Sequence, residues 1–307
     1  MGWIKDLGVS CGGIELKTPV IVASGVWPFE TEFWDRKSFP GLGAICTKAV
    51  TLHQREGNPG IRVWETPSGM LNSIGLQNGG VDLFLDHHVP EISQGGIPFI
   101  VNVAMEKIQE TGKVLEKLER HRSSIPAVEL NISCPNVSEG GMAWGTDALS
   151  SSRAVAMARE KWSGPLWVKL TPQAGDISLV ARAVQDQGAD ALVVGNTWLG
   201  MAMDVEKGKP VFGRVFAGLS GPAIFPLALR TVWEVCSSVS IPVVGCGGIA
   251  SPDDCLAMIM AGASAVEIGT LMFTHLNAGS MICSGIEEYL QSRGLDDVKD
   301  IMGIAMS

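Results

Sequence analysis

The chain has 307 residues and a formal net charge of −9 at pH 7, with only 18% charged residues and 37 glycines. The acidic balance repels phosphate backbones, which argues against nucleic-acid binding, and the composition favours a compact α/β protein over a coiled coil or a disordered chain. The seven cysteines are scattered and never spaced C-x-x-C, so we expect no disulfide framework, no iron–sulfur cluster and no metal site within this chain.

Membrane association is not expected either. Residues 1–6 contain no basic region followed by an apolar core, and the most apolar stretch, residues 255–266, is too short to cross a bilayer. These features predict a cytoplasmic protein.

Eight short apolar runs alternate with segments of helical period along the chain. The runs span residues 19–24, 44–48, 99–103, 128–133, 167–171, 192–197, 243–247 and 265–270. Between them, Ile108, Leu115 and Leu118 fall on one face of a helix, and Asp176 is placed to cap the start of another. Strands that alternate with helices are parallel, and eight such units match a TIM (β/α)8 barrel. With no linker or shift in composition, residues 1–307 are expected to form one domain.

Three connections are longer than the minimal barrel repeat requires. They are residues 51–97 after the second strand, 134–150 after the fourth and 198–221 after the sixth. Such connections leave the C-terminal ends of the strands, where barrel enzymes have their active sites.

The same strand ends carry polar or small residues. They are Ser24, Lys48, Asn102, Asn131, Lys169, Asn196, Thr197, Gly269 and Thr270. Barrel strands are buried on both faces, so polar side chains there need partners. Two explanations are open. The side chains could pair with one another, as Lys169 with Glu129 or Glu267, or they could contact a bound polar ligand, which the number of them on one rim favours.

Lys169 shares a face of its strand with Trp167 and Thr171, so its side chain is expected to point into the barrel. An unpaired buried ammonium would lose its proton, so either a carboxylate or an anionic ligand must lie close. A flavin, whose reduced ring is anionic, would meet this need, and the same argument applies to Lys48.

The last two strands end in glycine-containing loops, within residues 241–250 and 265–270. Loops after the seventh and eighth strands form the usual phosphate site of barrels. Gly245, Gly247 and Ala250 also fit the Rossmann fingerprint, with Glu267 as the ribose-binding acid. That match is weak, because six strands precede it.

Cys134 follows the fourth strand in a loop of polar residues, where its thiol could act as a base. The alternative is a buried structural cysteine, which is the usual state of a single thiol. The histidines lie away from the strand ends, His53 being the nearest, so no Ser/His/Asp arrangement competes.

Four segments resemble motifs of the dihydroorotate dehydrogenases, in order and at that family's spacing, over about residues 19–270. They are Asn72-Ser73-Ile74-Gly75-Leu76-Gln77-Asn78, Asn131-Ile132-Ser133-Cys134-Pro135-Asn136-Val137, Gly218-Leu219-Ser220-Gly221-Pro222-Ala223 and Gly245-Cys246-Gly247-Gly248-Ile249. Cysteine in place of serine at 134 resembles class 1, and the following Glu139-Gly140-Gly141 is similar to class 1B. That class implies an FMN-binding barrel, NAD⁺ as the final acceptor, and a partner subunit that carries FAD and a [2Fe-2S] cluster.

The resemblance also implies roles for individual residues, with Cys134 as the catalytic base that removes a proton while the adjacent ring carbon passes hydride to FMN. The implied FMN contacts are Ser24, Lys48, Ala49, Asn102, Asn131, Lys169, Gly195, Gly221, Gly247, Gly248, Gly269 and Thr270. The implied dihydroorotate contacts are Lys48, Asn72, Ser73, Ile74, Gly75, Leu76, Asn131, Asn136, Asn196 and Thr197. Neutral amides suit a pyrimidine, whose carbonyls and N–H groups need both donors and acceptors. The implied assembly is a homodimer core joined to two FAD/[2Fe-2S] subunits, a heterotetramer.

Two stretches depart from the family's usual sequence. Val26-Trp27-Pro28-Phe29-Glu30 replaces a glycine and aromatic loop, and Pro28 lacks an N–H donor for a flavin. Phe216-Ala217 replaces a more usual Thr-Gly beside the substrate.

Three other functions remain open at this point. One is a class 1A, fumarate-dependent dihydroorotate dehydrogenase. Another is an enzyme like the dihydropyrimidine dehydrogenases that acts on uracil or thymine. The third is a non-catalytic barrel that binds a flavin or a phosphate.

Overall fold

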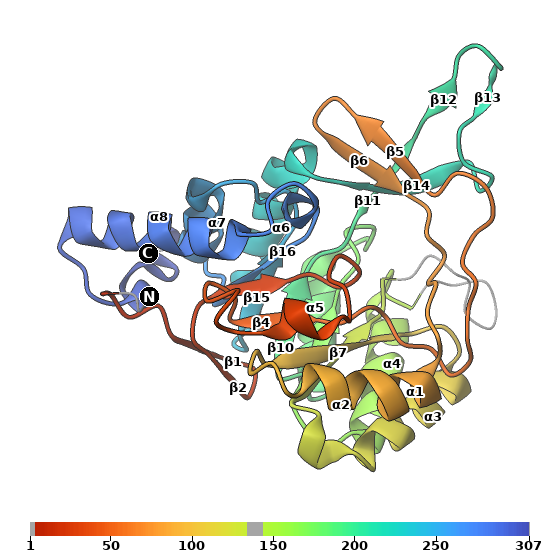
Figure 1. The fold of residues 1–307 in the computed structure, drawn as a ribbon, viewed down its shortest axis with the longest axis horizontal. Helices are drawn as coiled ribbons and strands as arrows, with labels where there is room; N and C mark the ends of the chain where they lie inside the picture. The colour runs from red at the N-terminus through yellow and green to blue at the C-terminus, as the bar shows by residue number, and fades with distance from the viewer. Residues whose placement is uncertain (1–3, 134–143, 307) are drawn as a thin grey trace.

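The computed structural model describes residues 4–133 and 144–306. Its centre is a closed barrel of eight parallel strands (Figure 1). In chain order they are β3 (Val20–Val22), β4 (Ala44–Cys46), β7 (Phe99–Ala104), β8 (Ala127–Asn131), β9 (Leu166–Lys169), β10 (Ala191–Val194), β15 (Val243–Cys246) and β16 (Ala265–Ile268), and β16 pairs with β3. Each overlaps one of the eight predicted runs, so the predicted TIM barrel is confirmed.

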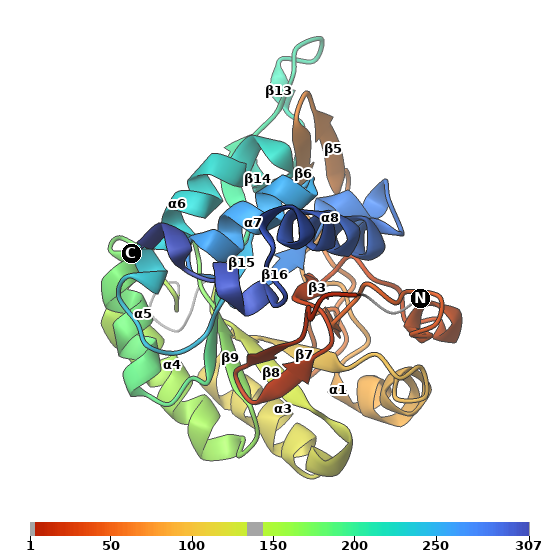
Figure 2. The same cartoon turned by 90° about the vertical axis from the view of Figure 1, so that its left-hand side faces the viewer.

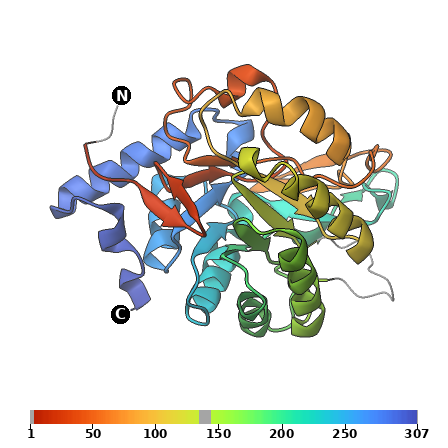
Figure 3. The same cartoon turned by 90° about the horizontal axis from the view of Figure 1, so that it is seen from below.

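Helices form an outer layer around the strands (Figures 2 and 3). The α-helices are α1 (Val81–Leu83), α2 (Val89–Ile92), α3 (Ile108–Glu119), α4 (Ala148–Lys161), α5 (Ile177–Asp186), α6 (Phe225–Cys236), α7 (Pro252–Met260) and α8 (Ala278–Arg293). A π-helical turn, η2 (Phe84–His88), joins α1 to α2. The 3₁₀ turns are η1 (Thr31–Trp34), η3 (Arg122–Ser124), η4 (Pro222–Ile224), η5 (Thr270–Phe273), η6 (Val298–Ile301) and η7 (Ile304–Met306).

Two sequence predictions for the helices are confirmed. Leu115 and Leu118 on α3 are buried, and Ile108 is partly buried against the same core. The Asp176 side chain caps α5 by accepting a hydrogen bond of 2.9 Å from the backbone N–H of Leu179. No helix of the described residues is both long enough and apolar enough to cross a membrane.

A short hairpin, β1 (Val9–Cys11) and β2 (Ile14–Leu16), precedes the barrel and was not predicted. The Trp167 indole on β9 donates a 3.0 Å hydrogen bond to the Gly12 carbonyl in the turn of this hairpin. A Cβ on Gly12 would lie only 2.5 Å from that indole nitrogen, so glycine is required there. The hairpin and Trp167 therefore pack against each other at the N-terminal end of the strands.

The long connections after the second and sixth barrel strands fold together on the opposite side of the barrel. Their strands form one antiparallel sheet in the order β11 (Trp198–Met201), β14 (Phe216–Ser220), β6 (Gly69–Asn72) and β5 (Val63–Thr66). A small hairpin, β12 (Met203–Asp204) and β13 (Lys209–Pro210), extends beyond it (Figure 1). This sheet lies over the C-terminal ends of the barrel strands. Most of the third long connection lies outside the described residues.

Candidate active site

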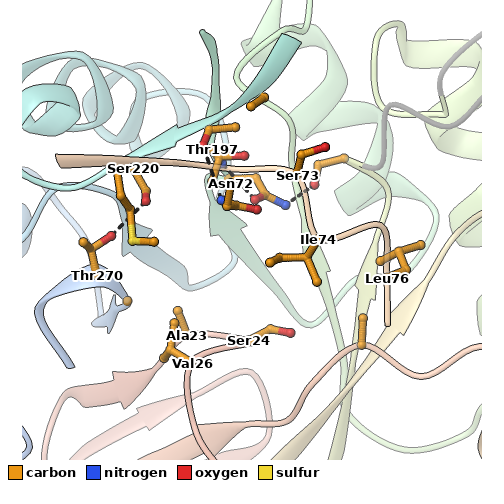
Figure 4. A pocket seen from close by; sticks show the side chains of 18 of the residues that line it. Ala23, Ser24, Val26, Asn72, Ser73, Ile74, Leu76, Thr197, Ser220 and Thr270 are labelled. Atoms are coloured by element: carbon orange, nitrogen blue, oxygen red, sulfur yellow. Dashed lines mark hydrogen bonds between the residues drawn. The ribbon is translucent and has the colours of Figure 1, made fainter. Parts of the chain in front are cut away.

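A cavity of about 380 Å³ lies between the C-terminal ends of the barrel strands and the four-stranded sheet. Most of the residues predicted as ligand contacts line it: Ser24, Lys48, Ala49, Asn72, Ser73, Ile74, Gly75, Leu76, Asn131, Lys169, Asn196, Thr197, Gly269 and Thr270. In Figure 4, Asn72 and Thr197 lie on one side of the cavity and Ser24 on the opposite side. The fold therefore brings together residues that are far apart in the sequence.

Lys169 lies at the inner end of this cavity, within the barrel. Its ammonium nitrogen is 2.5 Å from Glu267 Oε2 and 3.8 Å from Glu129 Oε1. Of the two explanations that the sequence left open, the carboxylate pairing is present in the structure, with Glu267 as the nearer partner. Burial disfavours the charged ammonium, but the acidic side chains around it, which include Glu129 and Glu267, outweigh burial and hold the Lys169 pKa well above its usual value.

Asn102 does not line the cavity, although it was predicted as a cofactor contact. It is fully buried within the barrel, and its side-chain amide donates a hydrogen bond to Glu129 Oε1. Asn102 thus supports the carboxylate that neighbours Lys169.

Lys48 is a second cation at the cavity, and burial lowers its pKa. Among the residues that the structure describes, no carboxylate lies within 4.0 Å of its ammonium. A half-buried ammonium without a protein counterion suits an anionic ligand group.

Side-chain amides and hydroxyls form the polar wall of the cavity. The side-chain oxygen of Asn131, Oδ1, accepts hydrogen bonds from the Ser133 hydroxyl (2.6 Å) and from the Ser133 backbone N–H (3.1 Å). The side-chain amide of Asn196 donates to the same hydroxyl. Asn72 donates to the Gly218 carbonyl at 3.3 Å. These bonds fix the orientation of the amides that face the cavity.

The loop that follows Asn72 is shaped by two residues with positive φ, Gly75 (77°) and Leu76 (57°). A Cβ on Gly75 would lie 2.6 Å from the Asn58 backbone nitrogen, so only glycine allows this close approach. The Asn78 amide donates to the Leu76 carbonyl at 2.7 Å and stabilises the unusual backbone of Leu76. Residues 72–78 therefore form one defined loop at the edge of the cavity.

Gly221, Gly247 and Gly248 do not line the cavity but lie beside it, around the start of α6. Gly248 has a φ of 77°, and a Cβ there would lie 2.5 Å from the backbone nitrogen of Phe225, the first residue of α6. Backbone N–H groups at a helix N-terminus are suited to binding a phosphate. Gly195 also lies just off the cavity, where its N–H donates to the Cys246 carbonyl at 3.0 Å.

The Rossmann interpretation of residues 245–250 does not fit this structure. Glu267, which that interpretation assigns to a ribose, is 1% exposed and faces Lys169 inside the barrel. The glycines follow the seventh strand of a closed barrel.

The first departure, residues 26–30, packs largely away from the cavity. The Trp27 indole donates to the Phe33 carbonyl at 3.0 Å, and its ring packs edge-on against Phe33 and Phe39. The Pro28 carbonyl accepts a 2.9 Å hydrogen bond from the Trp34 indole. Of this segment, only Val26 lines the cavity.

The second departure, Phe216-Ala217, lies on β14 at the cavity. Both residues line the cavity, and 59% of Phe216 is exposed whereas Ala217 is buried. The preceding residue, Val215, has a φ of 66°, which is strained for a β-branched side chain.

Cys134 and Asn136 lie outside the described residues, so their predicted roles stay predictions. Ser133, which precedes Cys134 in the sequence, lines the cavity.

Sequence reasoning missed several residues on the cavity. Asn58, Val63, Met70 and Leu199 come from the long connections, whose pairing no local pattern revealed, and Gln173 follows the fifth barrel strand. The position of Gln173 just after a strand end is the same signal that identified the other polar residues.

A metal site is not favoured inside the barrel, although Cys46, Glu129 and Glu267 offer ligand atoms within 4.8 Å of one another. The Lys169 ammonium already lies beside both carboxylates as their cation.

The fold and this cavity define a barrel with a polar ligand site at the C-terminal ends of its strands. A family model for dihydroorotate dehydrogenase matches residues 6–292. "Dihydroorotate dehydrogenase B (NAD(+)), catalytic subunit" of Geotalea daltonii is 43% identical over 298 residues, which cover 97% of each chain. The protein of the same description from Porphyromonas gingivalis is 45% identical over 294 residues, 95% of this chain and 94% of the relative. The chain belongs to the dihydroorotate dehydrogenase family.

A solved structure supports the fold. The dihydroorotate dehydrogenase of Eimeria tenella in complex with ferulenol superposes with a TM-score of 0.80 and 20% identity, over 98% of this chain and 89% of that chain. The predicted family and its B-type catalytic subunit are thus confirmed by the sequence relatives, and the barrel by the structural neighbour.

Proposed function

We propose that the chain is the catalytic subunit of an NAD⁺-linked dihydroorotate dehydrogenase, which oxidises dihydroorotate to orotate in pyrimidine (UMP) biosynthesis. The observation that carries this proposal is the cavity with two lysines and a wall of side-chain amides at the barrel mouth. The relatives named B-type catalytic subunits, at 43% and 45% identity over nearly the whole chain, support the same conclusion.

FMN is the proposed cofactor, and the residues present fit it. Lys169 would place a positive charge beside the flavin ring, and the glycines at the start of α6 would leave room for its phosphate. When bound, FMN would accept hydride from the substrate.

The chain's own side chains would bind and orient dihydroorotate. Lys48 would attract the carboxylate, because it has no carboxylate partner among the described residues. The amides of Asn72, Asn131 and Asn196 would meet the ring carbonyls and N–H groups. Cys134 would take the proton from the ring carbon, a step for which positioned general bases contribute about 10²–10⁴ in rate.

Electrons would leave through a partner subunit that carries FAD and a [2Fe-2S] cluster. The described thiols include Cys11, Cys46, Cys255 and Cys283, all buried, which supports placing the cluster on another chain. We further propose a cytoplasmic heterotetramer built on a homodimer. Exposed apolar side chains on the four-stranded sheet, Trp64, Leu199 and Met201, would suit contact with a second copy.

The proposal is tested by purifying the chain alone, recording its spectrum and adding dihydroorotate without oxygen. Bleaching of bound flavin is expected, and its absence would indicate a non-catalytic barrel. Orotate should compete with dihydroorotate, whereas competition by uracil would favour an enzyme of the dihydropyrimidine type. The chain alone should reduce a dye but not NAD⁺, and turnover with fumarate would move it to class 1A.

A further inference from the structure

Three charged side chains meet inside the barrel beneath the cavity, and their charges do not balance. Glu129, Lys169 and Glu267 are 0%, 4% and 1% exposed. The Lys169 ammonium lies within 4 Å of both carboxyl groups, so one cation faces two acids. With both acids ionised, the group would hold one uncompensated negative charge away from water, which is costly.

Each carboxyl group also has one oxygen without a partner. Glu129 Oε2 and Glu267 Oε1 are buried and make no hydrogen bond with the described residues. The other oxygen of Glu129 accepts from Asn102 and, at 3.4 Å, from the Cys46 thiol, and the other oxygen of Glu267 lies on Lys169. The two unpartnered oxygens are therefore the free positions at which a proton could be held.

Among the residues that the structure describes, the other titratable groups that face this cluster are thiols. Cys11 comes from β1, Cys46 from β4 and Cys246 from β15. Burial, with nearby carboxylates, raises the pKa of Cys11 to about 12, that of Cys46 well above its usual value, and that of Cys246 to about 12 despite the opposing effect of Lys169. These thiols stay neutral through the physiological range, so they neither supply nor remove the missing charge.

We propose that Glu129 and Glu267 hold one proton between their carboxyl groups, and that Glu267 is a positioning residue that sets how much of the Lys169 charge reaches the cavity. With the proton in place, the cluster is neutral and the ammonium faces a single carboxylate. Without it, two carboxylates oppose one ammonium and the cavity floor is negative.

Burial and the charge of Glu129 both raise the pKa of Glu267. Together they raise its pKa from an ordinary carboxyl value to about 8, although Lys169 opposes them. The proton is therefore retained at neutral pH and lost at mildly alkaline pH.

This inference rests on the proposed FMN site for its consequence. When bound, FMN would supply hydride acceptance, which adds two electrons and one proton, and Lys169 would then meet the negative charge of the reduced ring. That charge would favour the protonated form of Glu267, so a second proton would be taken up from solvent above the pKa of Glu267. Reduction would then consume two protons per two electrons at alkaline pH and one at lower pH.

The first test uses the flavin-free chain. The unfolding equilibrium of wild type, Glu267→Gln and Glu129→Gln is measured by denaturant from pH 6 to pH 9, with Glu288→Gln on the exposed face of α8 as the matched control. The folded state holds a proton that an unfolded glutamate has lost, so wild-type stability falls as pH rises, by up to about tenfold in the unfolding constant per pH unit.

Each cluster variant leaves one carboxylate for one ammonium, so the fall with pH should be absent in both and unchanged in Glu288→Gln. Parallel curves for all four proteins would overturn the proposal. So would a tightly bound divalent metal at one per chain in wild type, because the metal would then supply the missing positive charge.

The second test uses the FMN-loaded chain and measures the midpoint potential of the flavin against pH with a reference dye. The slope should double above the pKa of Glu267 in wild type and stay constant in Glu267→Gln. Identical slopes would contradict the proton uptake. A chain that binds no FMN would refute the proposed function instead, and the first test would still decide on the shared proton.

Discussion

Replacing Lys169 by alanine removes the only cation that lies within 4 Å of Glu129 or Glu267 in the described part of the chain. Both carboxyl groups are at most 1% exposed, so they would lose this ammonium at a site where they are otherwise buried. Removal of one partner from a buried ion pair costs about 3–5 kcal/mol. At roughly 2 °C per kcal/mol for a chain of this size, the melting temperature should fall by about 6–10 °C.

The loss should depend on pH. Without the ammonium, the buried carboxyl groups hold protons that the unfolded chain releases above its ordinary carboxyl pKa. The folded state then binds more protons than the unfolded state, so the stability of Lys169→Ala falls further as pH rises. Thermal unfolding at pH 6 and pH 9 measures this difference.

A double variant provides the control. Lys169→Ala with Glu267→Gln leaves one buried acid instead of two, so it should be more stable at pH 9 than Lys169→Ala alone. Equal stability of the two variants at pH 9 would refute the charge argument. The flavin-to-protein ratio after gel filtration should also fall in Lys169→Ala, and a wild-type ratio would mean that Lys169 serves its carboxylates and not the flavin.

Three further results are expected. Cys134→Ser should still bind orotate and FMN, but flavin reduction should be much slower, because an alcohol is a poorer base than a thiol. The difference in rate from wild type should shrink as pH rises. An unchanged stopped-flow rate would show that Cys134 takes no part in the reaction. Gly248→Ala should lose FMN, because its Cβ would lie 2.5 Å from the Phe225 nitrogen; a full flavin-to-protein ratio would contradict this. Asp176→Ala should cost about 1 kcal/mol in thermal unfolding and leave the flavin ratio unchanged, since it removes only the cap of α5.

The barrel could be predicted from the sequence because its strands are buried on both faces. Such strands are continuous apolar runs, as in β7, where every residue is buried. The hairpin β1–β2 escaped prediction because each strand has three residues, too few for a periodic pattern.

The four-stranded sheet could not be predicted for a different reason. Its strands β6 and β14 are paired so that Asn72 lies opposite Gly218, from two connections that are distant in the chain. Pairing of this range depends on the closed barrel beneath it and leaves no local signal. The cavity wall that these strands supply was therefore missed, although the motifs within them were identified by resemblance.

The charge balance in the cluster of Glu129, Lys169 and Glu267 could not be predicted from the positions of polar residues at strand ends. Two explanations were open for the polar residues there, pairing with one another or contact with a ligand, and Asn102 donates to Glu129 while Lys169 lines the cavity and contacts two acids. Alternation along a strand predicts which side chains enter the barrel, but it does not give their depth or the charge balance among neighbours from different strands. Glu129 lies on β8 and Glu267 on β16, strands that are not adjacent in the barrel, so only the closed fold brings their carboxyl groups to the same ammonium. Because the excess acid arises from closure, the proton that compensates it is a property of the folded barrel and disappears when the chain unfolds.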